Sequence, residues 1–266
     1  MAIKLNASVE PYKEFYGSNL AQMPKLIAEG RSPMNVSQLM QQRLNYRNGP
    51  QDVKTAYMDN YFDTGDAVVY HPNGDVKVVL DSQTLREMNP QSQLRNRALL
   101  LTDDVYKALD GEVFKKGKLG KTETSLTREE AKANPVWRAL ARDKSLLADY
   151  VDFTFAEGKE RFNYDNAMGV YMGSCSGDAP EMRSFCVGGL EGDGSVVDGR
   201  CGVDFDYGRL VGVAPEALGG ALAKGVSAVQ RYTMADLQTL DKALGGLEGT
   251  LHPDKLKPPV DFRKKL

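Results

Sequence analysis

Apolar positions near the start of the chain recur with a helical period. One stripe consists of Val36, Leu39, Met40 and Leu44. Asn35 precedes it and Gln38 follows three residues later, a spacing typical of a capping box. Asn-Gly-Pro at 48–50 is a strong helix stop, and a second short helix is expected over about 52–61. We therefore expect the first 65 residues to be helical.

Two β-branched runs follow, at 67–70 and 76–80. The residues between them include Asn73-Gly74, a pair that favours a tight turn, so the pattern predicts an antiparallel hairpin. Helical spacing returns after Thr127, which has Glu130 in the capping-box position. Its stripe continues to Phe155, although positions 151–155 also alternate as in a strand.

The second half of the chain is rich in glycine, with 14 of the 26 glycines between Gly169 and Gly225. Short strand-like pieces at 168–172, 182–187, 195–205 and 209–214 are separated by glycine-containing turns, which predicts an antiparallel β-meander. Two closing helices are expected, over about 216–231 and 234–244.

These elements predict an α+β protein with a helical first half containing one β-hairpin, a glycine-rich antiparallel meander in the second half, and closing helices. We expect residues 1–250 to form one compact unit, with its helical part at about 8–160 and its sheet part at about 165–250. Residues 251–266 carry prolines and basic side chains without an apolar period, so an extended basic tail is expected.

The composition is that of a soluble globular protein, with 41% hydrophobic and 26% charged residues among 266. No apolar run approaches the roughly 18 residues that span a bilayer, so no membrane partner is expected. The three cysteines, Cys175, Cys186 and Cys201, are an odd and small number. Unpaired thiols in a reducing compartment, and hence a cytoplasmic location, follow as an expectation.

Charge disfavours a broad nucleic-acid surface, because residues 151–250 hold 8 basic and 15 acidic side chains. One basic loop remains as a candidate for phosphate or nucleic-acid binding. Its lysines are Lys115, Lys116, Lys118 and Lys121. The segment Gly117–Thr122 partly matches a phosphate-binding P-loop, but Lys115 stands where that motif needs its first glycine. A solvated basic loop is the alternative interpretation.

Cys175 is the candidate catalytic residue. It is the centre of Gly-Ser-Cys-Ser-Gly at 173–177, which matches a nucleophile elbow, and His252 downstream could serve as its base in acyl transfer. Pro180 disfavours the helix that should follow such an elbow. A turn at a strand end, with a small buried thiol, is the structural alternative.

Metal and cofactor sites are not expected. Asp66 with Asp75 and Lys77 has the composition of a metal-dependent nuclease site, but so short a pattern arises often by chance. The segment Asp204–Gly208 begins like a calcium loop and then lacks the required glycine and glutamate. The cysteines are too far apart in sequence for a zinc knuckle.

The sequence therefore predicts a protein that acts by binding, with no identifiable catalytic centre. A protein partner or a second copy of the chain would fit this role. A cysteine-dependent acyl hydrolase using Cys175 is the first alternative, and phosphate or nucleic-acid binding through the Lys115–Lys121 loop is the second.

Overall fold

The computed structural model describes residues 12–191 and 194–215, which belong to one unit of the chain, Met1–Leu218. The described strands are β1 (Tyr12–Tyr16), β2 (Ser32–Pro33), β3 (Phe62–Tyr70), β4 (Val76–Val79), β5 (Leu94–Arg95), β6 (Ala98–Leu100), β7 (Glu112–Phe114), β8 (Val170–Tyr171), β9 (Glu181–Val187), β10 (Val197–Asp198) and β11 (Arg209–Val213). The described helices are α1 (Asn19–Ala28), α2 (Val36–Asn45), α3 (Gln51–Met58), α4 (Gln83–Arg86), α5 (Asp103–Ala108), α6 (Arg128–Ala133), α7 (Pro135–Ala141) and α8 (Lys144–Phe162). The expected closing helices and basic tail lie outside the described residues, so the domain boundaries stay predictions.

The strands form one mixed sheet in the order β1-β11-β3-β9-β10-β8. Beyond this path, β4 pairs with β3 and β7, β6 pairs with β5 and β9, and β2 pairs with β11. β11 runs parallel to β3 and β10 runs parallel to β8, whereas the other pairs are antiparallel. Helices combined with this sheet agree with the α+β prediction.

The prediction of an antiparallel meander in the second half is wrong. β3, from the first half, lies between β11 and β9, and two of the pairs are parallel. The expected strand over 195–205 is reduced to β10, followed by a loop. Short apolar pieces indicate strands but carry no information about which strand each one pairs with.

The prediction that the first 65 residues are all helical is also wrong. β1, β2 and the beginning of β3 lie in this segment. β1 pairs antiparallel with β11 from Tyr12↔Val213 to Tyr16↔Arg209, so its conformation depends on a strand almost two hundred residues away. α2 does begin with the predicted capping box, in which Asn35 and Gln38 exchange hydrogen bonds, and α3 is helical as expected.

The predicted hairpin is confirmed. β3 and β4 pair antiparallel from Ala67↔Val79 to Tyr70↔Val76. In the turn, Gly74 has a φ of +88°, which side-chain-bearing residues rarely adopt. The Asn73 side-chain oxygen accepts from the backbone N–H of Asp75 at 2.9 Å and so closes the turn.

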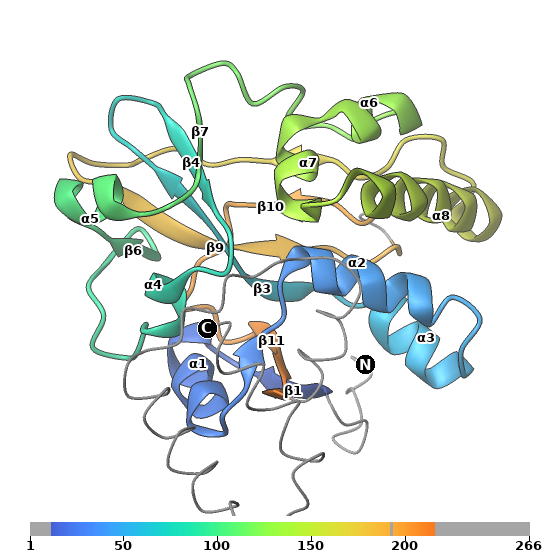
Figure 1. The fold of residues 1–266 in the computed structure, drawn as a ribbon, viewed down its shortest axis with the longest axis horizontal. Helices are drawn as coiled ribbons and strands as arrows, with labels where there is room; N and C mark the ends of the chain where they lie inside the picture. Colours follow the sequence, from blue (N-terminus) through green and yellow to red (C-terminus); the bar gives the residue numbers. More distant parts are fainter. Residues whose placement is uncertain (1–11, 192–193, 216–266) are drawn as a thin grey trace, which may run out of the picture. The chain divides into compact units, whose positions relative to one another are not determined.

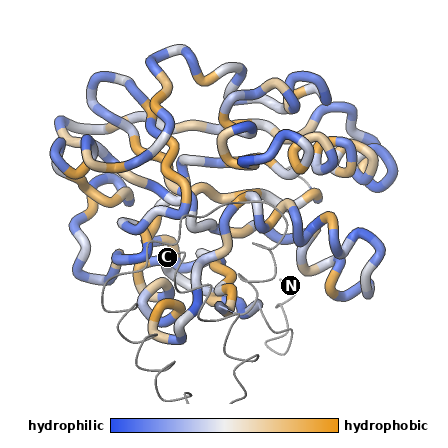
Figure 2. Tube along the Cα trace, viewed as in Figure 1, coloured by the Kyte–Doolittle hydropathy of each residue, from blue (hydrophilic) through white to orange (hydrophobic). Residues whose placement is uncertain are grey.

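Two hydrophobic cores lie on the two faces of the sheet (Figures 1 and 2). Along β3, Val68 and Tyr70 enter one core, whereas Ala67 and Val69 enter the other. The first core packs against α2, α3, α6, α7 and α8, and the second against α1 and α4. All nine residues of β3 are buried, because helices cover both of its faces.

The helices α6, α7 and α8 follow one another with local signals at each start (Figure 1). Thr127 and Glu130 form the predicted capping box of α6, and Asn134 caps α7 through two backbone N–H groups. Arg142, with a φ of +63°, separates α7 from α8. Because α8 continues to Phe162, residues 151–155 are helical and their strand-like alternation is coincidental.

Arg43 on α2 joins these helices to the sheet. Its guanidinium is fully buried and donates five hydrogen bonds of 2.8–3.0 Å. The acceptors are the backbone oxygens of Tyr57, Asn60 and Gly188 and the hydroxyls of Tyr150 and Ser195. One side chain therefore holds α2, the end of α3, α8 and the segment after β9 together.

No helix among residues 12–191 and 194–215 is both long enough and apolar enough to cross a membrane.

Candidate functional site

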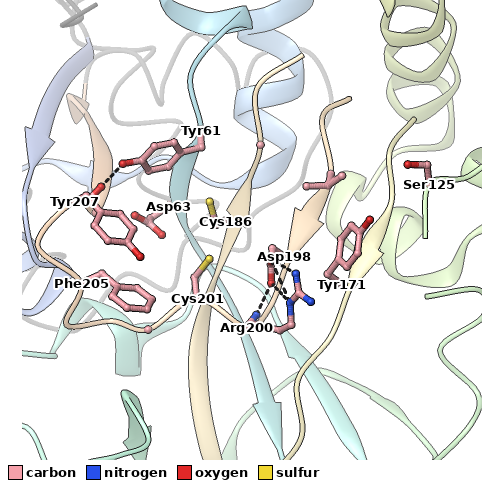
Figure 3. A pocket seen from close by; sticks show the side chains of 14 residues that line it. Tyr61, Asp63, Ser125, Tyr171, Cys186, Asp198, Arg200, Cys201, Phe205 and Tyr207 are labelled. Atoms are coloured by element: carbon pink, nitrogen blue, oxygen red, sulfur yellow. Dashed lines mark hydrogen bonds and ion pairs between the residues drawn. The ribbon is translucent and has the colours of Figure 1, made fainter. Parts of the chain in front are cut away.

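A cavity of about 490 Å³ opens beside β3, β9 and β10 (Figure 3). Four of its ten polar or aromatic side chains come from the loop between β10 and β11, and the others come from β3, β8, β9 and β10 and the segments before β3 and α6. The side chains that line it include Tyr61, Asp63, Ser125, Tyr171, Cys186, Asp198, Arg200, Cys201, Phe205 and Tyr207. Strand residues form the floor of the cavity, and the loop contributes to the two walls described next.

One wall of the pocket is aromatic. Phe205 and Tyr207 stack with ring centroids 4.9 Å apart and an interplanar angle of 16°. The Tyr61 hydroxyl donates a hydrogen bond to the backbone oxygen of Tyr207, which ties the loop to the start of β3. The guanidinium of Arg97 lies 4.4 Å from the centroid of the Phe205 ring. This wall therefore offers ring surface that already holds one cation.

The opposite wall carries an ion-pair cluster around Arg200. Its guanidinium donates to Asp198 at 2.8 Å and to Glu123 at 3.3 Å. It also lies 4.6 Å from the centroid of the Tyr171 ring. Figure 3 shows Asp198, Arg200 and Tyr171 facing the aromatic wall across the cavity.

Asp63 lies on the floor of the pocket, 4% exposed. Its carboxylate accepts a hydrogen bond from the backbone N–H of Arg209 at 2.8 Å. Burial raises the pKa of Asp63 to about 6, although the Arg209 N–H and the Asn19 side chain favour the ionised form. The pocket therefore contains a carboxyl group that changes its charge close to neutral pH.

Cys186 and Cys201 lie in the middle of the pocket (Figure 3). Cys186 is buried on β9, and Cys201 is partly exposed on the loop after β10. The hydrogen bond to Cys201 is the main cause that raises the pKa of the Cys186 thiol, and burial adds to it. No disulfide joins cysteines among the described residues, and their redox state in the cell stays a prediction.

Cys175, the candidate nucleophile, lies elsewhere, in the segment between β8 and β9. Its thiol donates to the backbone oxygens of Ala179, at 3.1 Å, and Gly177, at 3.4 Å. No helix lies between β8 and β9, so the strand–turn–helix context of a nucleophile elbow is missing in this part of the chain. His71 packs against Tyr106 and pairs with Asp103 instead. His252 lies outside the described residues.

The lysine-rich loop connects β7 to the segment before α6. Lys115 pairs with Asp75 at 2.7 Å and Lys121 pairs with Glu130 at 2.9 Å, whereas Lys116 and Lys118 are exposed. The next helix, α6, begins at Arg128, so no helix N-terminus directly follows the partial P-loop motif. The structure thus brings two of the four lysines onto carboxylates and leaves two in solvent.

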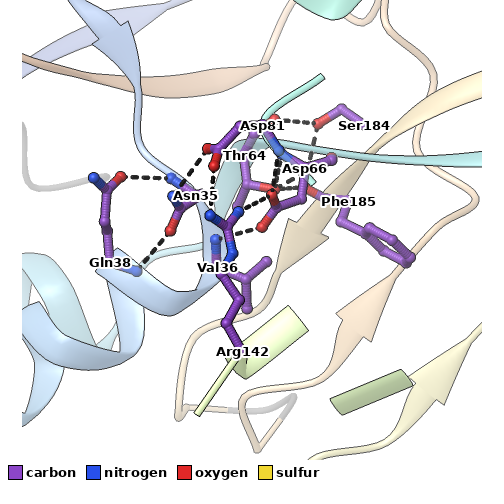
Figure 4. A network of polar contacts seen from close by, with 9 residues as sticks. All are labelled: Asn35, Val36, Gln38, Thr64, Asp66, Asp81, Arg142, Ser184 and Phe185. Carbon is purple, nitrogen blue, oxygen red and sulfur yellow. Dashed lines mark hydrogen bonds and ion pairs between the residues drawn. The ribbon is translucent and has the colours of Figure 1, made fainter. Parts of the chain in front are cut away.

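Asp66, the other carboxylate considered for a metal, belongs to a buried polar network (Figure 4). It accepts from the backbone N–H groups of Val36 and Asp81, each at 2.9 Å, and pairs with Arg142 at 2.6 Å. This network anchors the start of α2, the residue after β4 and the junction of α7 and α8 to β3. Within the described residues, no group of three or more His, Cys, Asp or Glu side chains could hold a metal ion.

Sequence reasoning missed the pocket. In the sequence, Phe205 and Tyr207 fall within the partial calcium-loop pattern at 204–208, next to the strand expected over 195–205. The structure has a loop there. The usable signal was the density of glycine and aromatic residues over 199–208, which is unusual for a strand and typical of a shaped loop.

Comparison with known proteins gives a fold. One solved structure is similar to this chain, with a TM-score of 0.58. It comes from work on the accommodation of massive sequence variation in Nanoarchaeota by the C-type lectin fold. The fold resembles the C-type lectin fold. The alignment covers 78% of this chain and 100% of that one, at 18% identity. No protein-family model and no curated protein matches this chain.

Proposed function

We propose that this chain is a binding protein whose ligand enters the pocket between the β10–β11 loop and the sheet. The observation that carries the proposal is the cavity of about 490 Å³ with one aromatic wall and one charged wall. Ligand pockets commonly combine ring surface with a few fixed polar groups. The side chains of both walls are anchored by hydrogen bonds or stacking, so much of the site exists before a ligand arrives.

The chemistry of the pocket favours a cationic ligand. Its lining contains two carboxylates, Asp63 and Asp198, and one guanidinium, Arg200. Guanidinium groups already lie over the rings of Phe205 and Tyr171, at 4.4 and 4.6 Å. A planar or aromatic group that carries an amine or guanidinium, on a small molecule or on a protein partner, meets both features.

The fold is compatible with this role. The similar structure concerns a C-type lectin fold that accommodates massive sequence variation. In the present chain the two cores are formed almost entirely by residues outside the pocket loop. Val203 is the one residue of that loop that enters a core. Loops held by a rigid scaffold are frequent sites of binding.

The test is a ligand-detected NMR screen with matched probes that share a phenyl ring and differ in charge: phenethylamine, 2-phenylethanol and 3-phenylpropionate. We expect saturation transfer to be strongest for the amine and to be lost in Phe205→Ala. Tyr106→Ala, which removes an aromatic side chain that packs against His71 outside the pocket, is the control and should bind as the parent does. Strongest binding of the carboxylate, or unchanged binding by Phe205→Ala, would reject the proposal.

The two alternatives stay predictions without further support. No contact in the described residues favours acyl transfer at Cys175, whose thiol neighbours are two backbone oxygens. For the lysine loop, the ion pairs of Lys115 and Lys121 reduce the free positive charge. The cytoplasmic location likewise stays a prediction.

A further inference from the structure

Two cysteines that are distant in sequence meet inside the pocket. Cys186 lies on β9, where its backbone is paired with Asp198 of β10 on one side and with Asp63 of β3 on the other. Three residues beyond Asp198 the chain reaches Cys201, whose side chain turns back toward Cys186 (Figure 3). The pleat of β9 therefore fixes one sulfur, and the loop brings the second to it.

The two thiols differ in their surroundings. Cys186 is 8% exposed and is held by strands on both sides, whereas Cys201 is partly exposed on a loop. Figure 3 shows the two sulfur atoms turned toward each other inside the pocket that both residues line. A solvent-accessible sulfur with a second sulfur in contact is the arrangement in which an oxidised cysteine is resolved as a disulfide.

We propose that Cys186 and Cys201 form a redox-active dithiol that closes to a disulfide within the pocket. The oxidant is a peroxide. The Cys201 sulfur attacks one peroxide oxygen, the O–O bond breaks, and a sulfenic acid and the first water result. The Cys186 sulfur then attacks the Cys201 sulfur, the S–O bond breaks, and the second water leaves. The two sulfurs are oxidised, one hydrogen peroxide is reduced, and both thiol protons end in water.

The disulfide would connect β9 to the β10–β11 loop. Disulfide formation requires the two Cα atoms to come within roughly 4.4–6.8 Å. The loop position of Cys201 allows this adjustment, since its neighbours Gly199 and Gly202 lie outside the regular strands. The bond would fix the wall that carries Phe205 and Tyr207, so the inference reaches beyond the proposed function and does not depend on the identity of a ligand.

The experiment is oxidation of the full chain with hydrogen peroxide, followed by alkylation of free thiols, digestion without reductant and mass spectrometry. We expect one cross-linked peptide pair, containing Cys186 and Cys201, lighter than the separate peptides by two hydrogen atoms. Amide hydrogen exchange over 199–208 should slow on oxidation and return to its original rate on reduction. In parallel, phenylarsine oxide, which bridges neighbouring thiols, should bind at one arsenic per chain.

Single substitutions identify which two cysteines form the disulfide. Cys175→Ser should keep the cross-link and the arsenic binding, whereas Cys201→Ser and Cys186→Ser should each lose both. Cys201→Ser is the decisive variant, because Cys201 lies on a loop and its replacement leaves both cores intact. A cross-link that includes Cys175, stable sulfinic acid at Cys201 without any cross-link, or arsenic binding that survives in Cys201→Ser would overturn the proposal.

Discussion

At the scale of single residues, the protein relies on a few buried polar side chains that connect separate elements. Arg43 donates to five oxygen atoms contributed by α3, the residue after its cap, α8 and the segment between β9 and β10, and Asp66 receives three donors from as many segments. Each group is satisfied only when all its neighbours are in place. Such networks specify one arrangement of the chain and are expensive to break.

Arg43→Ala is expected to lower the free energy of unfolding by about 3–5 kcal/mol, because five hydrogen bonds are lost, four of them fully buried. Urea denaturation measures the change. The control is Arg47→Ala, an exposed arginine just beyond the same helix, which should change stability by no more than about 0.5 kcal/mol. Equal effects of the two substitutions would contradict the role assigned to Arg43.

Asp63 makes stability depend on pH. Its pKa is raised from 3.8 to about 6 in the folded chain, so the folded state holds this proton more tightly than the unfolded state. The contribution of the protonated group is complete below about pH 4 and is lost as pH rises through about 6, at a cost of about 3 kcal/mol. Asp63→Asn removes the titration and keeps an oxygen acceptor for the Arg209 N–H.

Stability of the parent and of Asp63→Asn should therefore be compared between pH 4 and pH 7.5 by urea unfolding. We expect the free energy of unfolding of the variant to rise relative to that of the parent by about 2–3 kcal/mol across this interval. A stability difference that stays constant over the whole interval would show that Asp63 is ionised at all these pH values.

At the scale of elements, local signals predicted the starts of α2 and α6 and the β3–β4 hairpin, but they could not specify how the other strands pair. The capping residues Asn35 and Thr127 act within four residues of sequence, so their effect can be seen in the sequence itself. The hairpin was equally local, since its turn residues join the two strands directly. β1 and β11, in contrast, pair across almost the whole described chain, and no local pattern specifies such a partner.

Among the helix caps, Asn134 is the residue whose loss should destabilise the fold most. It ends α6 and begins α7, accepts from the N–H groups of Val136 and Trp137, and donates to the backbone oxygen of Lys121. Asn134→Ala should lower the free energy of unfolding by about 1–2 kcal/mol. Thr102→Ala, at the cap of the short helix α5, which buries none of its residues, should cost about 0.5 kcal/mol. The reverse order would refute this ranking.

At the scale of the whole described unit, β3 is the common partner of the two halves. β11 and β9, from the second half, pair with it together with β4, and both cores touch it. The pocket follows from this arrangement, because Tyr61 and Asp63 meet the loop over 199–208 only after β3 lies between β9 and β11. For this reason the pocket could not be predicted from separate segments of sequence.

Rates of amide hydrogen exchange should reflect the central position of β3. We expect peptides from β3 and β9 to exchange most slowly, because their amides are paired on a sheet covered by two cores. Peptides from α5 and from the lysine loop after β7 should exchange fastest, since α5 buries no side chain and Lys116 and Lys118 are exposed. Mass spectrometry over a time course measures the rates, and equally fast exchange in β9 and α5 would contradict the assignment.

The pairing of β1 with β11 also decides how the unit responds to mechanical force. Tyr12 begins β1, Val213 ends β11, and the two residues are direct partners. A pull that separates them loads the hydrogen bonds of this ladder one after another, from Tyr12↔Val213 toward Tyr16↔Arg209, and not all at once. The ladder therefore opens one pair at a time, and the same pull on Val213 also loads β2, whose Ser32 and Pro33 pair with Val213 and Gly212.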